Sequence, residues 1–351
     1  DCVVMAHVGG RYADIKFAHD GAMETAVEVH SAWGTFEWIV RDAFEKGYRV
    51  GIVGNSDGHK GRPGACYPGA SFFGSYGGLT CFLASRLDRD GIFASMRARR
   101  HYATTGNRPY LDVAVGTEQD AHVFATDPAL GPAKSMATRR LVMGDIASIA
   151  DGEVELSVDV VGTAPIERLD IYDGLDLIET VRPYTAADLG TRVRLVYEGA
   201  EYRGRARTTT WDGRLDVLGN RILRTAVINN WNLDRGIRSQ EATAVTWKAV
   251  TTGNYGAIDM WLEGQGGDLA FKTAPVSGEV PIASLGLEPR IFSAGGLERA
   301  LCLQKLPDQM REYRIALKRR VPLRGKGDTR LFIRVQQEDG HRAWSSPIYL
   351  F

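Results

Sequence analysis

Hydrophobic and polar positions follow different patterns in the two parts of this chain. Near the start, apolar runs at 3–6, 26–29 and 48–53 are separated by polar or helix-like stretches, and such runs are typical of buried strands in an α/β fold. From about Tyr110 onward, apolar residues occupy every second position, for example over 154–160, and Asp-Gly turns separate the runs. Period-two alternation with such turns predicts an all-β, sandwich-like region.

Each of the three early strands is predicted to end in polar side chains. His7 follows the first run, His30 closes the second, and Asp57 and His59 follow the third. The carboxyl ends of strands in α/β folds face one crevice, where such folds place their chemistry. An Asp-x-His pair with extended backbone offers an oxygen and a nitrogen ligand that suit Zn, Mn or Fe. A solvated turn is the alternative for residues 55–58, because Asn, Ser, Asp and Gly are common turn residues.

A predicted helix and a long loop lie on either side of the third strand and its Asp-x-His pair. Thr35 is placed to cap a helix that runs to about Lys46, since a threonine hydroxyl accepts from a backbone N–H of the first turn. Segment 61–78 is rich in Gly, Pro and aromatic residues and is too long for a plain connection. We interpret it as an active-site loop in which Lys60 and Arg62 could meet a phosphate, or else as a self-packed surface loop with solvated charges.

Composition narrows the classes of protein to which this chain can belong. The 351 residues suggest about two domains, and Lys plus Arg balance Asp plus Glu at 43 each, so no bulk charge favours nucleic acid or an anionic membrane. No apolar stretch approaches the ~20 residues of a membrane helix. The 4 cysteines are scattered and indicate neither a zinc ribbon nor a disulfide framework. The compartment is left open because the true N-terminus is expected to be missing, with a cytoplasmic location favoured.

Three early segments together resemble a known family. They are His-x-Gly-Gly at 7–10, Val-Glu-Val-His-Ser-Ala-Trp-Gly-Thr-Phe-Glu-Trp at 27–38, and Gly-Asn-Ser-Asp-Gly-His-Lys-Gly-Arg-Pro-Gly at 54–64. They look like the PHP (polymerase and histidinol phosphatase) superfamily, and more narrowly like a bacterial branch made up of domains of unknown function. Residues 77–80 and 99–106, and more loosely 344–347, match that branch too, so the resemblance is densest over 1–107 and extends over nearly the whole chain.

The resemblance implies a distorted (β/α)7 barrel whose cluster of two or three divalent metal ions hydrolyses phosphoesters. It implies His7, Asp57 and His59 as metal ligands, with Asp57 and His59 at the catalytic centre. Glu28 and His30 are then supporting residues or candidate ligands, and Lys60 and Arg62 are candidate substrate-binding residues.

The chain departs from the family in lacking the His-x-His motif and the other ligands of the first half of such a barrel. We therefore expect a C-terminal part of a longer protein, with a partial barrel over 1–109 and a β-sandwich-like domain over 110–351. The expected fold class is α/β plus all-β. The predicted function is a metal-dependent phosphoesterase acting on a small-molecule phosphoester, and the site is completed by the missing N-terminal segment. The alternatives are a metal-dependent ester or amide hydrolase and a non-catalytic β-rich binding or assembly module; a homo-oligomer is compatible with either.

Overall fold

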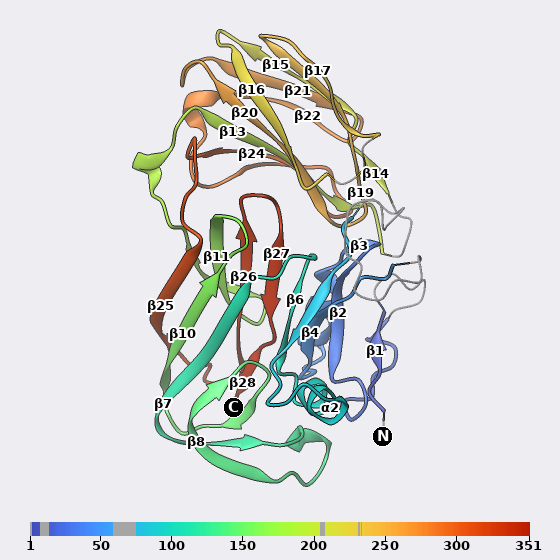
Figure 1. Ribbon diagram of the computed structural model, residues 1–351, viewed down its shortest axis with the longest axis vertical. Coiled ribbons are helices and arrows are strands. Elements are labelled where there is room, and N and C mark those ends of the chain that lie inside the picture. Colours follow the sequence, from blue (N-terminus) through green and yellow to red (C-terminus); the bar gives the residue numbers. More distant parts are fainter. Residues whose placement is uncertain (1, 8–13, 59–74, 204–207, 231, 233) are drawn as a thin grey trace.

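A computed structural model describes residues 2–7, 14–58, 75–203, 208–230, 232 and 234–351 (Figure 1). The fold is mostly β, with 51% of residues in strands and 8% in helices. The described residues contain two α-helices and three short 3-10 helices, which are α1 (Trp38–Glu45), α2 (Arg89–Arg97), η1 (Pro128–Leu130), η2 (Ala186–Asp188) and η3 (Ile282–Ser284). None of the helices in this described part is long and apolar enough to cross a membrane.

The first unit is a small sheet that carries the predicted strands. Its strands are β1 (Met5–Ala6), β2 (Ala26–Ser31), β3 (Gly34–Thr35) and β4 (Gly51–Gly54). Strands β1 and β4 run parallel to the central β2, whereas β3 turns back against it. Helix α1 connects β3 to β4 and buries Ile39, Val40 and Ala43. Thr35 lies in β3 and bonds to His30 instead of capping the helix, whose N-cap is Glu37 without a side-chain hydrogen bond.

The second unit is a 12-stranded sheet. Its strands are β5 (Leu79–Phe82), β6 (His101–Thr104), β7 (Tyr110–Phe124), β8 (Ser135–Val142), β9 (Ile146–Ser148), β10 (Glu153–Val161), β11 (Ile166–Asp173), β12 (Asp176–Val181), β25 (Arg314–Pro322), β26 (Thr329–Gln337), β27 (Arg342–Ser345) and β28 (Ile348–Leu350). It curls around one core, because Ile315 on the edge strand β25 and Ala343 on β27 belong to the same buried cluster.

The third unit consists of two 5-stranded sheets at the top of Figure 1, joined by a two-stranded ribbon. One sheet contains β13 (Arg192–Ala200), β16 (Ile222–Ile228), β20 (Tyr255–Leu262), β23 (Arg290–Ser293) and β24 (Leu297–Leu306); the other contains β15 (Gly213–Leu218), β17 (Gly236–Gln240), β18 (Ala244–Lys248), β21 (Asp268–Thr273) and β22 (Ser277–Pro281); the ribbon is β14 (Thr209–Thr210) with β19 (Val250–Thr251). The two sheets share one core, in which Leu195 and Met260 of the first lie with Leu215 and Phe271 of the second.

The expected partial (β/α)7 barrel is wrong. Such a barrel needs a helix after nearly every strand, and in the described residues only α1 lies within the parallel sheet. The chain instead continues into β5 and β6, which form an antiparallel pair, and the C-terminal β27 then pairs with β6. Strands from the end of the chain therefore cover the small sheet where the barrel would have had helices.

The beginning and the end of the chain share a core. Val29 and Ile52 of the small sheet lie in one buried cluster with Trp344 and Tyr349. The Tyr349 hydroxyl donates to the Val50 carbonyl and accepts from the Val50 N–H at 2.6 and 2.8 Å. The small sheet is thus fixed against the 12-stranded sheet, which holds the strand ends of the candidate site in place.

The first and third units touch at Gly34, where we predict a large cost for any side chain. Gly34 has φ of 142°, and a Cβ built there would lie 2.1 Å from the Thr252 carbonyl oxygen. Gly34→Ala should therefore lower the free energy of unfolding by roughly 2–4 kcal/mol, because backbone strain and overpacking add. Guanidinium denaturation followed by tryptophan fluorescence measures this change.

Gly131 is the matched control, because its φ is 141° and nothing lies within 4 Å of its Cβ position. Gly131→Ala bears the backbone strain alone and should cost at most about 2 kcal/mol. Equal losses in the two variants would show that the contact between Gly34 and Thr252 contributes nothing.

Candidate functional site

Three parallel strand ends bring the predicted residues together. His7 follows β1, Glu28 lies in β2, and Asn55 and Asp57 follow β4. The register aligns Ala6 with Val27 and Glu28 with Val53, so these side chains gather at one edge of the small sheet. The sequence pattern predicted this edge, because parallel strands present their carboxyl ends on the same side.

Glu28 is the centre of the hydrogen bonding at this edge. Its side chain is 4% exposed, and its Oε2 lies 2.6 Å from His7 Nδ1. Its other oxygen accepts from the Asn55 amide at 2.7 Å. A carboxylate only accepts, so His7 donates from Nδ1 to Glu28. Asn55 was not singled out from the sequence, although it stands at the end of the same strand.

The second nitrogen of His7 faces Asp57. Nε2 lies 3.4 Å from Asp57 Oδ2, and the two side chains are 44% and 19% exposed. In a neutral imidazole that donates from Nδ1, Nε2 is an acceptor, so two acceptors face each other here. Two ligands of a tetrahedral ion with bonds of about 2.0–2.2 Å lie about 3.4 Å apart. This donor set fits a divalent metal ion, and a doubly protonated His7 would satisfy the same geometry.

The loop after β4 is not extended. Asp57 has φ of 44°, in the left-handed region that aspartate tolerates better than most residues. An Asp-x-His spacing points both side chains into one crevice only where the backbone is extended, a condition that Asp57 does not meet. His59, Lys60 and Arg62 lie outside the described residues, so their predicted roles stay predictions. Within the described residues, no group of three or more His, Cys, Asp or Glu side chains is placed to hold a metal ion.

His30 lies beneath this edge with both ring nitrogens engaged. Nε2 donates to the Tyr76 carbonyl at 2.6 Å, and Nδ1 accepts from the Thr35 hydroxyl at 2.8 Å. Burial lowers the pKa of His30 to about 4, so the ring is neutral near pH 7. The Tyr76 ring in turn packs edge-on against His341, between β26 and β27. His30 thus links the candidate site to the 12-stranded sheet, a contact that the sequence pattern did not indicate.

Comparison with known proteins does not identify a family for this chain. No protein-family model, curated protein or solved structure was found to match the chain.

Proposed function

We propose that the chain is a metal-dependent hydrolase that acts on phosphoesters. The observation that supports this proposal is the arrangement of His7 Nε2 and Asp57 Oδ2, 3.4 Å apart at the carboxyl edge of a parallel sheet. His7 and Asp57 would hold the metal, and His59 is the predicted third ligand. A bound Zn, Mn or Fe ion would supply a hydroxide near neutral pH and polarise the bond to be cleaved.

The chain's own residues would orient the ligands. Glu28 accepts a hydrogen bond from His7 Nδ1 and so orients the ring, an arrangement common behind metal-binding histidines. Asn55 donates to the other oxygen of Glu28 and limits its rotation. The choice of a phosphoester over a carboxylic ester or amide rests on the resemblance of the early motifs to PHP enzymes, and a substrate panel tests it.

Asp57→Asn is the test of this proposal. The exchange keeps the shape of the side chain but removes the charge that a metal ligand needs, so metal affinity should fall by at least about tenfold. Protein stripped with a chelator and reloaded with Mn or Zn is assayed by elemental analysis, by melting temperature, and with p-nitrophenyl esters of phosphate and acetate. Metal should raise the melting temperature of the unmodified chain, as a ligand of the native state must.

Asp120→Asn provides the control, because Asp120 is 58% exposed and pairs with Arg139 at the surface. It should bind metal and hydrolyse substrate like the unmodified chain. Unchanged metal content and hydrolysis in Asp57→Asn would refute the assignment, whereas cleavage of acetate without phosphate esters would change only the substrate class.

A further inference from the structure

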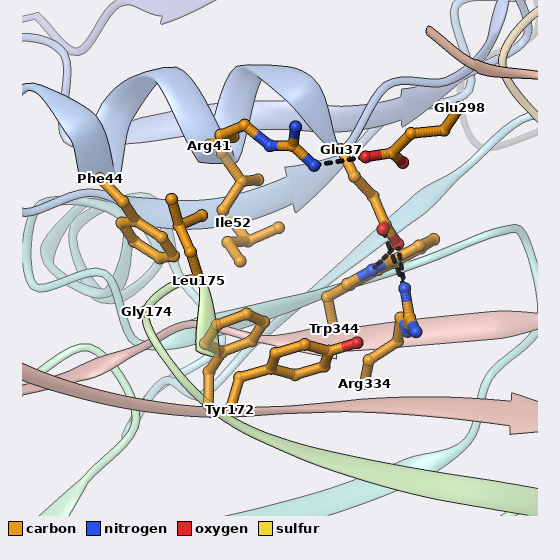
Figure 2. A pocket seen from close by; sticks show the side chains of 12 residues that line it. Glu37, Arg41, Phe44, Ile52, Tyr172, Gly174, Leu175, Glu298, Arg334 and Trp344 are labelled. Atoms are coloured by element: carbon orange, nitrogen blue, oxygen red, sulfur yellow. Dashed lines mark hydrogen bonds and ion pairs between the residues drawn. The ribbon is translucent and has the colours of Figure 1, made fainter. Parts of the chain in front are cut away.

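A polar cavity lies where the three units meet, away from His7 and Asp57. We call it the junction cavity; its volume is about 280 Å³. Its walls come from the first turn of α1, from Arg168 and Arg342 of the 12-stranded sheet, and from residues 198–200 of the third unit. A more apolar pocket of about 250 Å³ adjoins it beneath α1. Figure 2 shows that neighbouring pocket, which shares the Arg41–Glu298 ion pair with the junction cavity.

Arg168 and Arg342 are partly buried arginines that form few hydrogen bonds. Their side chains are 18% and 11% exposed. Both donate to the same neutral oxygen, Gln336 Oε1, at 3.3 and 3.2 Å. Arg168 forms ion pairs with Asp170 and Glu167 at 3.4 and 3.9 Å, and Arg342 forms one with Glu198 at 3.8 Å. In the part of the chain that the structure describes, none of these contacts is a hydrogen bond. Each guanidinium carries five N–H donors, so most of these donors have no acceptor among the described residues.

The neighbouring arginine shows the contrast. Arg334 also lines the junction cavity, but its Nη1 donates to Glu37 and its Nη2 to Asp170, both at 2.9 Å. Figure 2 shows the Arg334 pairing with Glu37, beside Trp344. Buried charges are normally paired in this way, because an isolated charge in a poorly hydrated site is costly.

Two more observations indicate unused donors at the same place. Trp38 lines the junction cavity, and its indole Nε1 is buried with no hydrogen-bond partner among the described residues; Arg168 Nε is in the same condition. Among the described residues, the carboxylates that line the cavity form no hydrogen bond to Arg168, Arg342 or Trp38. Glu37 is held by Arg334 and Trp344, Glu298 pairs with Arg41, and Glu198 lies 3.8 Å from Arg342 Nη2.

We infer that the junction cavity binds a small organic anion through Arg168, Arg342 and Trp38. A terminal carboxylate or phosphate provides several acceptor oxygens in the planar or tetrahedral geometry that guanidinium forks match. The volume of about 280 Å³ is room for a small metabolite and not for a macromolecule. Because the cavity is formed by all three units, the bound anion would hold them together. This inference does not depend on the proposed hydrolase activity.

The test is the melting temperature with 20 mM inorganic phosphate or malonate as probes, at ionic strength matched with chloride. EDTA is present so that no metal at His7 and Asp57 can bind the anion. If the dissociation constant of the probe is about 1 mM, the melting temperature of the unmodified chain should rise by about 4 °C with the probe that binds. A rise with phosphate alone, malonate alone or both identifies the group recognised. A rise with neither probe overturns the inference.

Variants locate the site. Arg342→Gln and Arg168→Gln should each remove at least half of the shift, and Arg342→Lys should keep part of it. Arg224→Gln is the matched control, because Arg224 is exposed and stacks on Trp261 in another cleft; it should retain the full shift. A shift that survives in both Gln variants overturns the inference.

A second measurement uses the unmodified chain alone, so it tests the inference even if the variants do not fold. Phenylglyoxal modification is mapped by mass spectrometry with and without the probe. Phosphate or malonate should protect Arg168 and Arg342 at least threefold more than Arg224, and equal protection of all three would contradict the inference.

Discussion

Arg194→Met is expected to lower the free energy of unfolding by about 3–5 kcal/mol, because it removes one partner of a buried ion network. The Arg194 side chain is fully buried. Its Nε donates to Asp259 Oδ1 at 2.6 Å, and its Nη1 donates to Glu167. Without the guanidinium, the Glu167 carboxylate keeps, among the described residues, amide donors from Gln304 and Gln336 and a 3.9 Å ion pair with Arg168. Guanidinium denaturation followed by tryptophan fluorescence measures the loss.

The position of this network explains the size of the effect. Arg194 lies in β13 of the third unit, whereas Glu167 lies in β11 of the 12-stranded sheet. The network continues from Asp259 to Arg192 and from there to Glu338, just after β26. Arg194→Met therefore removes a contact between units as well as a bond within one sheet.

Arg314→Met is the control for Arg194→Met. Arg314 pairs with Asp159 at 2.9 Å, but its side chain is 63% exposed, so its removal should cost less than about 1 kcal/mol. Arg194→Lys keeps the charge without the guanidinium fork and should fall between the two. If Arg194→Met remained within about 1 kcal/mol of the unmodified chain, the network would not stabilise the junction.

The sequence predicted the local elements better than their assembly. Buried runs that end in polar residues correctly placed β2 and β4 and brought His7, Glu28 and Asp57 to one edge. The same runs contain no information on which elements pair beside them. A short apolar run such as Leu79–Phe82 fits a barrel strand or an antiparallel one equally well. It pairs with β6, whose other neighbour, β27, comes from the far end of the chain.

The period-two pattern could not predict the buried ion network around Arg194, for a related reason. Arg192 and Arg194 alternate with Val193 and Leu195 along β13, and alternation of this kind predicts an apolar face inside and a charged face in water. The apolar face does lie in a core. The charged face is buried as well, because the 12-stranded sheet covers it with carboxylates such as Glu167. Only the arrangement of the units in space reveals that second layer.

Acidification should destabilise the protein well before its carboxylates titrate, because two histidines are buried in the neutral form. Burial lowers the pKa of His30 and of His101 to about 4 each, whereas an unfolded histidine titrates near 6.5. Above that pH both states are neutral and this contribution to stability is complete. Between pH ~6.5 and ~4 only the unfolded state takes up the protons, so stability falls as the pH decreases. By pH 5 the loss should be about 2 kcal/mol per histidine.

His101 allows this effect to be isolated. Its Nδ1 donates to the Ile52 carbonyl at 3.0 Å, and its Nε2 is buried without an acceptor among the described residues. A proton added at Nε2 therefore gains no partner. His101→Gln can keep a donor for Ile52 but does not titrate, so the loss of unfolding free energy between pH 7.5 and pH 5 should shrink by about 2 kcal/mol.

His122→Gln, at an exposed position, is the control and should leave that loss unchanged. Urea denaturation at both pH values gives all three differences. If His101→Gln kept the full loss, the proton uptake would lie elsewhere in the chain. If the unmodified chain lost no stability over this range, neither His30 nor His101 would be held neutral by burial.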